Sequence, residues 1–388
     1  MGEINILIAG DFVPSGRVYN LIEKGDFVDA FSQVRVLTSE VDYSIVNLEA
    51  PIVLDDVILP KLKSGPNLKA SIKTIDALKY VGFNCVTLAN NHLCDYGDEG
   101  VRNTISSCAK NNIDYVGAGE NIEEAKKILY KKIKNKTIAF VNFCEEEFSI
   151  ATESMSGACP LNIVNNTYQI QEAKRMADYV IVIVHGGVEM YRYPTPRMQE
   201  TYRFFVDMGA DVVINHHQHC YSGFERYKEK LIFYGIGNFC FDKGGDNVLW
   251  NEGYIVKLSF IKGNNNIEFN ILPYIQGSVD FTGIRLMDVV EKDKFQNDID
   301  KINEVINSEL LEFQFEEYLD KVHFGRILNL EPIYNKYVRF LQSKNILPHL
   351  LGKKAYLDWY NRLNCETHRE VLLNILYKKI YGRYKNKK

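Results

Sequence analysis

Five short apolar segments of the chain are each followed by a side chain that could bind a metal ion. These side chains are Asp11, Glu49, His185 and members of the segments 90–92 and 215–219. Carboxylate, amide and imidazole groups suit manganese, iron, zinc or nickel, whereas copper(I) and iron–sulfur clusters are typical of thiolate ligands. The residue types therefore predict a site for divalent metal ions.

Each of these signals is weak when it is taken alone. A Gly-Asp pair after a strand commonly forms a turn, and a single histidine is more often a hydrogen-bonded residue than a ligand. Asn90 and Asn91 could form a turn with His92 as a capping side chain, and Glu49, before Pro51, could be a loop carboxylate. It is the number of independent signals that favours a metal site.

The segment 215–219 contains three histidines, and two of them can face one metal centre. Alternate residues of an extended segment point to the same side, so His217 and His219 would face the metal while His216 points away. The alternative pair, His216 and His219, would require a helical turn directly after the strand. The thiols of Cys94 and Cys220 lie beside these motifs and are interpreted as buried cysteines rather than ligands.

The elements that must position these side chains alternate along the chain. Apolar and β-branched runs predict strands over 4–9, 44–48, 84–88, 137–143, 179–184, 211–214 and 231–234. Amphipathic stretches predict helices over 71–81, 98–109 and 197–208, the first with Ser71 as its cap. This alternation predicts an α/β protein with a largely parallel or mixed sheet covered by helices.

The strand ends are the expected place of the site. In α/β sheets, ligands bind beyond the carboxyl ends of strands, where the loops are free to carry chemistry. We therefore expect one cavity to be surrounded by Asp11, Glu49, Asn91, His185, His217 and His219. A site that includes both Asp11 and His219 requires their side chains to lie within about 10 Å of each other.

The chain changes character towards its end. Two runs, 254–260 and 267–273, flank a polar turn and predict a hairpin that closes the first domain. After Phe281, segments rich in Leu, Glu, Lys and aromatic residues predict helices over 289–306, 310–319, 330–341 and 366–377. We expect an α/β domain over residues 1–280 and a mainly helical region over residues 281–388.

Composition and charge exclude several classes of protein. The 388 residues include 46 Lys and Arg against 50 Asp and Glu, so nothing in the charge requires nucleic acid or an anionic membrane. The longest apolar run, 180–184, is far shorter than the roughly 18 residues of a membrane-spanning helix. The N-terminus lacks a signal-peptide pattern, and eight scattered cysteines suit free thiols in a reducing compartment. These features favour a cytoplasmic protein without a transmembrane segment or a nucleic-acid partner, and they leave peripheral membrane attachment open.

Seven short motifs follow one another along the first part of the chain. They are GD (10–11), NLE (47–49), LANNHxxDYG (88–97), VGAG (116–119), HGGVE (185–189), HHQH (216–219) and YGIGNF (234–239). In this order they resemble the CapA/PgsA family, which is associated with bacterial capsule and poly-γ-glutamate synthesis. The resemblance covers about residues 3–275. It implies the calcineurin-like metallophosphoesterase fold, a four-layer α/β/β/α sandwich with a dinuclear metal site at the strand ends.

The resemblance also implies a role for each matched residue. Asp11 and His219 would bind one divalent ion, and Glu49 would bridge it to a second. The second ion would also be held by Asn91, His185 and His217, and Mn, Fe or Zn suits this mixture of ligands. His92 takes the place of the superfamily's general acid, and Asp95 would orient its ring.

The chain departs from the superfamily pattern at several positions. Val13 stands where the superfamily's first motif, DxH, has its histidine, so one metal would lose a ligand. Glu49 takes the bridging role that usually belongs to a GDxxD motif. Gly186 replaces a tryptophan that is frequent in the family, which predicts an enlarged pocket, and Asn215 and Gln218 change polarity more than ligation.

Together these inferences predict a metal-dependent hydrolase of the phosphoesterase type. Two cations about 3.5 to 4 Å apart can activate water and stabilise the oxygens of an in-line displacement at phosphorus. The substrate would be a phosphoester small molecule or an anionic polymer of the capsule or cell envelope. The alternatives are an assembly component that binds polymer or capsule-synthesis partner proteins without turnover, and a ligand-binding domain with a degenerate site.

Overall fold

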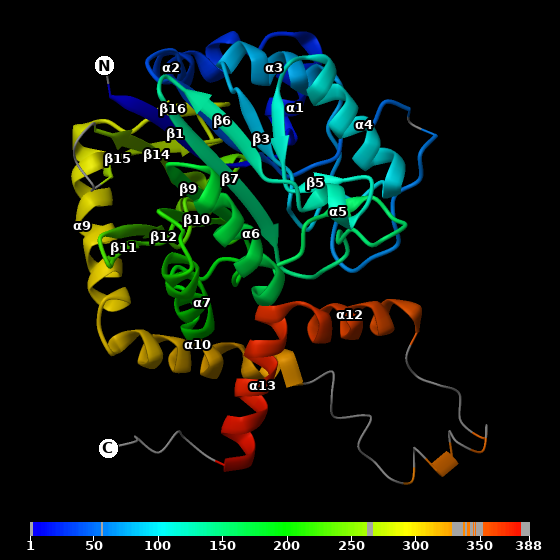
Figure 1. The fold of residues 1–388 in the computed structure, drawn as a ribbon. Coiled ribbons are helices and arrows are strands. Elements are labelled where there is room, and N and C mark those ends of the chain that lie inside the picture. Colours follow the sequence, from blue (N-terminus) through cyan, green and yellow to red (C-terminus); the bar gives the residue numbers. More distant parts are fainter. Residues whose placement is uncertain are drawn as a thin grey trace.

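Two β-sheets packed face to face form the centre of the protein, and helices cover their outer sides (Figure 1). The computed structural model describes residues 3–55, 57–261, 267–327 and 352–381, with isolated positions between 337 and 346. All seven strands predicted from apolar runs are present, with bounds that differ by a few residues at most.

The first sheet has the order β16-β15-β14-β1-β2-β3-β4, and β13 pairs with β1 beyond the end of β14. Its parallel strands are β1 (Ile4–Phe12), β2 (Tyr43–Leu48), β3 (Cys85–Thr87), β4 (Asp114–Val116) and β13 (Asn238–Cys240). Its antiparallel strands are β14 (Glu252–Phe260), β15 (Glu268–Gln276) and β16 (Ile284–Leu286). The pairing of β14 with β15 confirms the predicted hairpin strands; residues 262–266 of the connection lie outside the described residues.

The second sheet has the order β11-β12-β10-β9-β7-β6. Its strands are β6 (Leu129–Ile133), β7 (Lys136–Cys144), β9 (Tyr179–His185), β10 (Val212–His216), β11 (Phe224–Tyr227) and β12 (Lys230–Phe233). The central four, β7, β9, β10 and β12, run parallel, so their carboxyl ends share one edge. A small two-stranded sheet pairs β5 (Ala118–Gly119) with β8 (Gly157–Ala158).

The alternation of side chains along β1 explains the layers. Ile4, Ile6 and Ile8 pack into a core shared with the second sheet, whereas Leu7 and Ala9 pack into a core shared with the first group of helices. That group is α1 (Gly16–Lys24), α2 (Val28–Ser39), α3 (Lys73–Val81) and α4 (Gly97–Lys110). On the second sheet lie α6 (Ile163–Met176) and α7 (Pro196–Asp207), and short helices α5 (Ile122–Ala125) and α8 (Val248–Asn251) sit in loops. The predicted four-layer α/β/β/α architecture is confirmed.

Helix α3 begins later than predicted. It starts at Lys73 with Ile72 in the capping position, and Ser71 does not cap it. The Ser71 hydroxyl instead donates a hydrogen bond to Glu23 in α1, which explains why a serine with the right spacing failed as a cap.

The C-terminal part is helical, as predicted, and it follows β16. Its helices are α9 (Val289–Ile306), α10 (Leu310–Ile327), α12 (Lys353–Asn364) and α13 (Glu366–Tyr381). Asp288 and Glu291 form a capping box at the start of α9, whose apolar side packs onto the second sheet. The helix predicted over 330–341 falls mostly on residues outside those described. None of the described helices is long and apolar enough to cross a lipid bilayer.

Candidate metal centre

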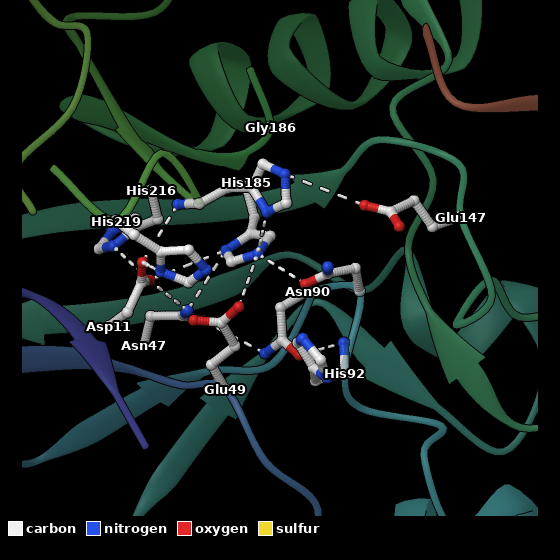
Figure 2. A network of polar contacts seen from close by, with 12 residues as sticks. Asp11, Asn47, Glu49, Asn90, His92, Glu147, His185, Gly186, His216 and His219 are labelled. Atoms are coloured by element: carbon white, nitrogen blue, oxygen red, sulfur yellow. Dashed lines mark hydrogen bonds and ion pairs between the residues drawn. The ribbon is translucent and has the colours of Figure 1, made fainter. Parts of the chain in front are cut away.

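The candidate ligands gather where strands of both sheets end (Figure 2). Asp11 lies on β1, and Glu49 follows β2. Asn91 lies in the turn after β3, and His185 is the last residue of β9. His217 and His219 follow β10.

Asp11 is aimed by an irregularity in β1. The strand continues to Phe12 rather than ending at Ala9, and its register with β2 shifts between Ala9 and Asp11. Gly10 is required at this point, because a Cβ atom there would lie 1.9 Å from the carbonyl oxygen of Gly237.

Two groups of ligand atoms form around Glu49. One contains Glu49, His185 and His217, the other contains Asp11, Glu49 and His219, and within each group the ligand atoms lie within 4.8 Å of one another. Asn91 belongs with the first group, because its Oδ1 is 3.0 Å from His185 Nε2. The geometry therefore brings together all six residues that the sequence suggested as ligands, with Glu49 common to both groups.

The surroundings of the Glu49 carboxylate indicate whether a cation fits this site. Its side chain is fully buried, and neither carboxylate oxygen accepts a hydrogen bond from any residue that the structure describes. His185 Nε2 lies 3.4 Å from Glu49 Oε1. Burial and the neighbouring Asp11 charge raise the pKa of Glu49 well above its usual value. A buried, unpaired carboxylate is costly unless a cation compensates it, so this site suits a metal ion.

Two of the three candidate imidazoles are in the form that binds metal. Burial lowers the pKa of His185 and of His217 to about 3, so both rings are neutral at physiological pH. The pKa of His219 is raised despite its burial, because Glu49 and Asp11 lie close by. Burial alone would raise the pKa of Asp11, but its contacts with His216 and the other histidines hold it below its ordinary value.

The local backbone around these histidines differs from the prediction. Strand β10 ends at His216, and both His217 and His219 have left-handed φ angles, 90° and 57°. Alternation along an extended segment is therefore not the reason that the two rings approach the site. His216 does not point away either, because its Nδ1 lies 3.3 Å from Asp11 Oδ1.

Two further residues hold the ligands in place, and a third lies near them. Asn47 Nδ2 donates to Asp11 Oδ1 at 2.7 Å and lies 3.3 Å from His185 Nδ1. His219 Nδ1 is 2.9 Å from Asn238 Oδ1, which leaves Nε2 of that ring for a metal. Glu147 Oε1 lies 3.9 Å from His217 Nε2. Sequence reasoning missed the contacts of Asn47 and Glu147 with the site; Asn47 stands in the NLE motif, whereas nothing local marks Glu147.

His92 lies beside the ligands in a network of its own. Its Nδ1 is 2.7 Å from Asp95 Oδ2, the carboxylate expected to orient the ring. Lys63 pairs with the same carboxylate and lies 3.1 Å from His92 Nδ1, with its side chain almost fully buried. Burial lowers the pKa of His92. Because Asp95 engages Nδ1 of His92, Nε2 is the ring nitrogen that can exchange a proton with a bound substrate.

Two of the departures from the superfamily pattern have different structural results. Val13, at the position of the absent histidine, packs in a small apolar cluster with Phe241 and Trp250. Gly186 does not enlarge the pocket, because a Cβ atom there would lie 2.7 Å from the side chain of Glu145, which fills the space. The prediction of an enlarged pocket at Gly186 was therefore wrong.

The sequence of the chain is similar to those of known proteins. A family model described as "Bacterial capsule synthesis protein PGA_cap" matches residues 5–243. The chain is 33% identical over 249 residues to the capsule biosynthesis protein CapA of Bacillus anthracis, covering 62% of this chain and 61% of that protein. It is 33% identical over 267 residues to the PGA biosynthesis protein CapA of Bacillus subtilis (strain 168), covering 68% of this chain and 69% of that protein.

Two solved structures from Thermus thermophilus superpose on the chain. A 5′-nucleotidase precursor from Thermus thermophilus superposes with a TM-score of 0.40 at 10% identity, covering 79% of this chain and 60% of that chain. A hypothetical protein from the same organism superposes with a TM-score of 0.46 at 14% identity, covering 70% of this chain and 99% of that chain.

Proposed function

The chain belongs to the bacterial capsule synthesis protein family PGA_cap, and from this premise we propose that it is a metal-dependent hydrolase in the synthesis of a capsule or poly-γ-glutamate polymer. Its substrate would be a phosphoester or a related ester or amide. The observation that carries the proposal is the buried carboxylate of Glu49, which has no hydrogen-bond partner among the described residues and belongs to both groups of candidate ligands.

The residues of the site divide into those that would hold metal and those that would act on the substrate. Asp11, Glu49 and His219 would hold one ion, and Asn91, His185 and His217, together with Glu49, would hold another. Bound divalent ions of this kind lower the pKa of water and offset negative charge that develops during ester hydrolysis.

His92 is suited to the proton transfer. Asp95 holds its Nδ1 and fixes the ring, so that Nε2 can deliver a proton to the leaving oxygen. Lys63, buried against the same carboxylate, keeps Asp95 in place. Asn47 and Asn238 restrict the orientations of Asp11 and His219 respectively, which keeps the ligands arranged before metal arrives.

One observation favours a second candidate, a component that binds polymer or a capsule-synthesis partner without turnover. Val13 and its apolar neighbours occupy the position where a further ligand would stand, so an ion held by Asp11 and His219 would have fewer protein ligands. An ion bound weakly there would leave the protein able to bind an anionic ligand but slow to hydrolyse it.

Metal analysis combined with turnover separates the two candidates. We expect purified protein, stripped with EDTA and then reloaded with Mn²⁺, to retain metal after gel filtration and to hydrolyse p-nitrophenyl phosphate or bis-p-nitrophenyl phosphate. His219→Ala should lose both properties. Stoichiometric metal without turnover of either ester would favour the second candidate, and failure to retain any metal would overturn the proposal.

A further inference from the structure

A pocket of about 240 Å³ lies directly beside the metal centre. We refer to it as the Trp250 pocket, and the lining residues that matter here are Glu189, Lys243, Asn247 and Trp250. The ring of Trp250 is 4.9 Å from the ring of His219, centroid to centroid, so the pocket shares a wall with the ligands. A ligand held in it would extend from the metal site.

The aromatic wall of this pocket is held firmly. The indole Nε1 of Trp250 donates to the carbonyl oxygen of Phe241 at 2.7 Å, and the two rings lie 4.8 Å apart in an edge-to-face arrangement. The carbonyl oxygen of Trp250 accepts from Asn238 and Gln276 at 3.3 and 3.1 Å. The indole therefore presents a fixed surface, which lowers the entropic cost of binding against it.

Lys243 places a positive charge on that surface. Its Nζ lies 3.1 Å from the centroid of the Trp250 ring and 5.4 Å from that of Phe241. No carboxylate among the described residues lies within ion-pair distance of it. The adjacent Asp242 is unavailable, because Arg17 engages both of its carboxylate oxygens at 2.8 to 2.9 Å. Lys243 is therefore a cation that a ligand can reach.

Glu189 contributes the opposite charge to the same pocket. Within the part of the chain that the structure describes, its carboxylate forms neither an ion pair nor a side-chain hydrogen bond. Lys243 and Glu189 thus line one small pocket, where the Glu189 charge acts on Lys243 but the two groups form no ion pair at contact distance. A ligand that complements both must carry a negative group and an N–H donor.

We propose that the Trp250 pocket binds an acidic amino-acid unit of the substrate, with its carboxylate on Lys243 and its amide or ammonium N–H on Glu189. The assignment rests on the proposed function for the neighbouring metal site, but it uses none of the metal ligands. The pocket is smaller than a typical site for a drug-sized ligand, so one such unit fits it better than a whole ligand. A phosphate group fits less well, since Glu189 would repel it and a single lysine offers no bidentate donor.

Tryptophan fluorescence can test this binding without any assay of turnover. The chain has two tryptophans, so a Trp359→Phe background leaves Trp250 as the only tryptophan reporter. The EDTA-treated protein is titrated with a γ-linked glutamate trimer, with an α-linked trimer and with inorganic phosphate. The variants are Lys243→Gln, Lys243→Arg and Glu189→Gln. Lys228→Gln is the matched control, since Lys228 also lies over an aromatic ring, 5.0 Å from that of Tyr227, far from the pocket in the sheet order.

We expect a glutamate trimer to bind and Lys243→Gln to weaken its binding at least tenfold, whereas Lys243→Arg and Lys228→Gln retain it. Glu189→Gln should weaken binding of the trimer, because it removes the charged acceptor for the trimer's N–H group. It should strengthen binding of phosphate, because it removes the negative charge that repels phosphate. Binding that is unchanged in Lys243→Gln would overturn the assignment, and so would phosphate binding more tightly than either trimer.

The outcome is separable from that of the proposed function. If reloaded protein shows no turnover while the trimer still binds through Lys243, the hydrolase proposal fails and the pocket assignment stands. If turnover occurs but the Lys243 variants bind the trimer as tightly as the parent does, the pocket assignment fails and the hydrolase proposal stands.

Discussion

Replacing Glu49 with glutamine should stabilise the metal-free protein, although it removes a central ligand. Glu49 is completely buried, and its carboxylate has no hydrogen-bond partner in the described structure. Its raised pKa means that the metal-free fold disfavours the ionised carboxylate relative to the unfolded chain. At pH 7 the unfolded carboxyl is ionised, so this preference lowers stability by about 1.4 kcal/mol for each unit by which the pKa is raised, and a neutral amide avoids that cost.

The pH dependence follows from the direction of the shift. A raised folded-state pKa makes the folded protein bind more protons than the unfolded chain, so this group's contribution to stability falls as pH rises above 4.5. We therefore expect Glu49→Gln in EDTA to unfold at higher urea concentration than the parent at pH 7, by about 1 to 3 kcal/mol. The difference should shrink towards zero at pH 4. With Mn²⁺ the order should reverse, because metal stabilises only the parent.

Glu145 provides the matched control. It is also a buried glutamate, but its carboxylate accepts hydrogen bonds from Arg197 at 2.5 Å and Thr367 at 2.6 Å, and these contacts lower its pKa in spite of burial. Glu145→Gln should therefore destabilise the protein at pH 7 by about 2 kcal/mol with or without metal. The reasoning is refuted if Glu49→Gln is less stable than the parent in EDTA at pH 7, or if its effect is the same at pH 4 and pH 7.

Four further substitutions test the site and its surroundings. His92→Ala should leave metal content nearly unchanged and lower turnover about 10² to 10⁴-fold on a substrate with a poor leaving group. His217→Ala should lose metal and activity together. Equal metal loss in both variants would show that His92 is a ligand. Gly186→Ala should lower stability by about 1 to 3 kcal/mol in urea unfolding, because the new methyl group would meet Glu145 at 2.7 Å, and an unchanged midpoint would contradict this packing. Arg197→Ala removes ion pairs that join α7 to Glu145 and to α13, so limited proteolysis should cut the C-terminal helices faster than in the parent, and an unchanged rate would argue against that role.

Much of the secondary structure could be predicted from the sequence, because it depends on neighbours along the chain. Apolar runs marked every strand that carries a candidate ligand. The rule that parallel strands present their carboxyl ends at one edge then placed six side chains together, and Asp11 Oδ2 lies 3.8 Å from His219 Nδ1, well inside the expected limit. The prediction that these residues bind metal remains to be tested.

What only the tertiary structure decided involves residues that are far apart in the chain. The left-handed backbone at His217 and His219, the filling of the space at Gly186 by Glu145, and the approach of Trp250 to His219 have no local signal. The hydrogen bond of Thr367 to Glu145 likewise joins residues 222 positions apart. Such contacts depend on how two sheets and a C-terminal helix pack at atomic spacing, whereas periodicity in a sequence reports only which side of an element is buried.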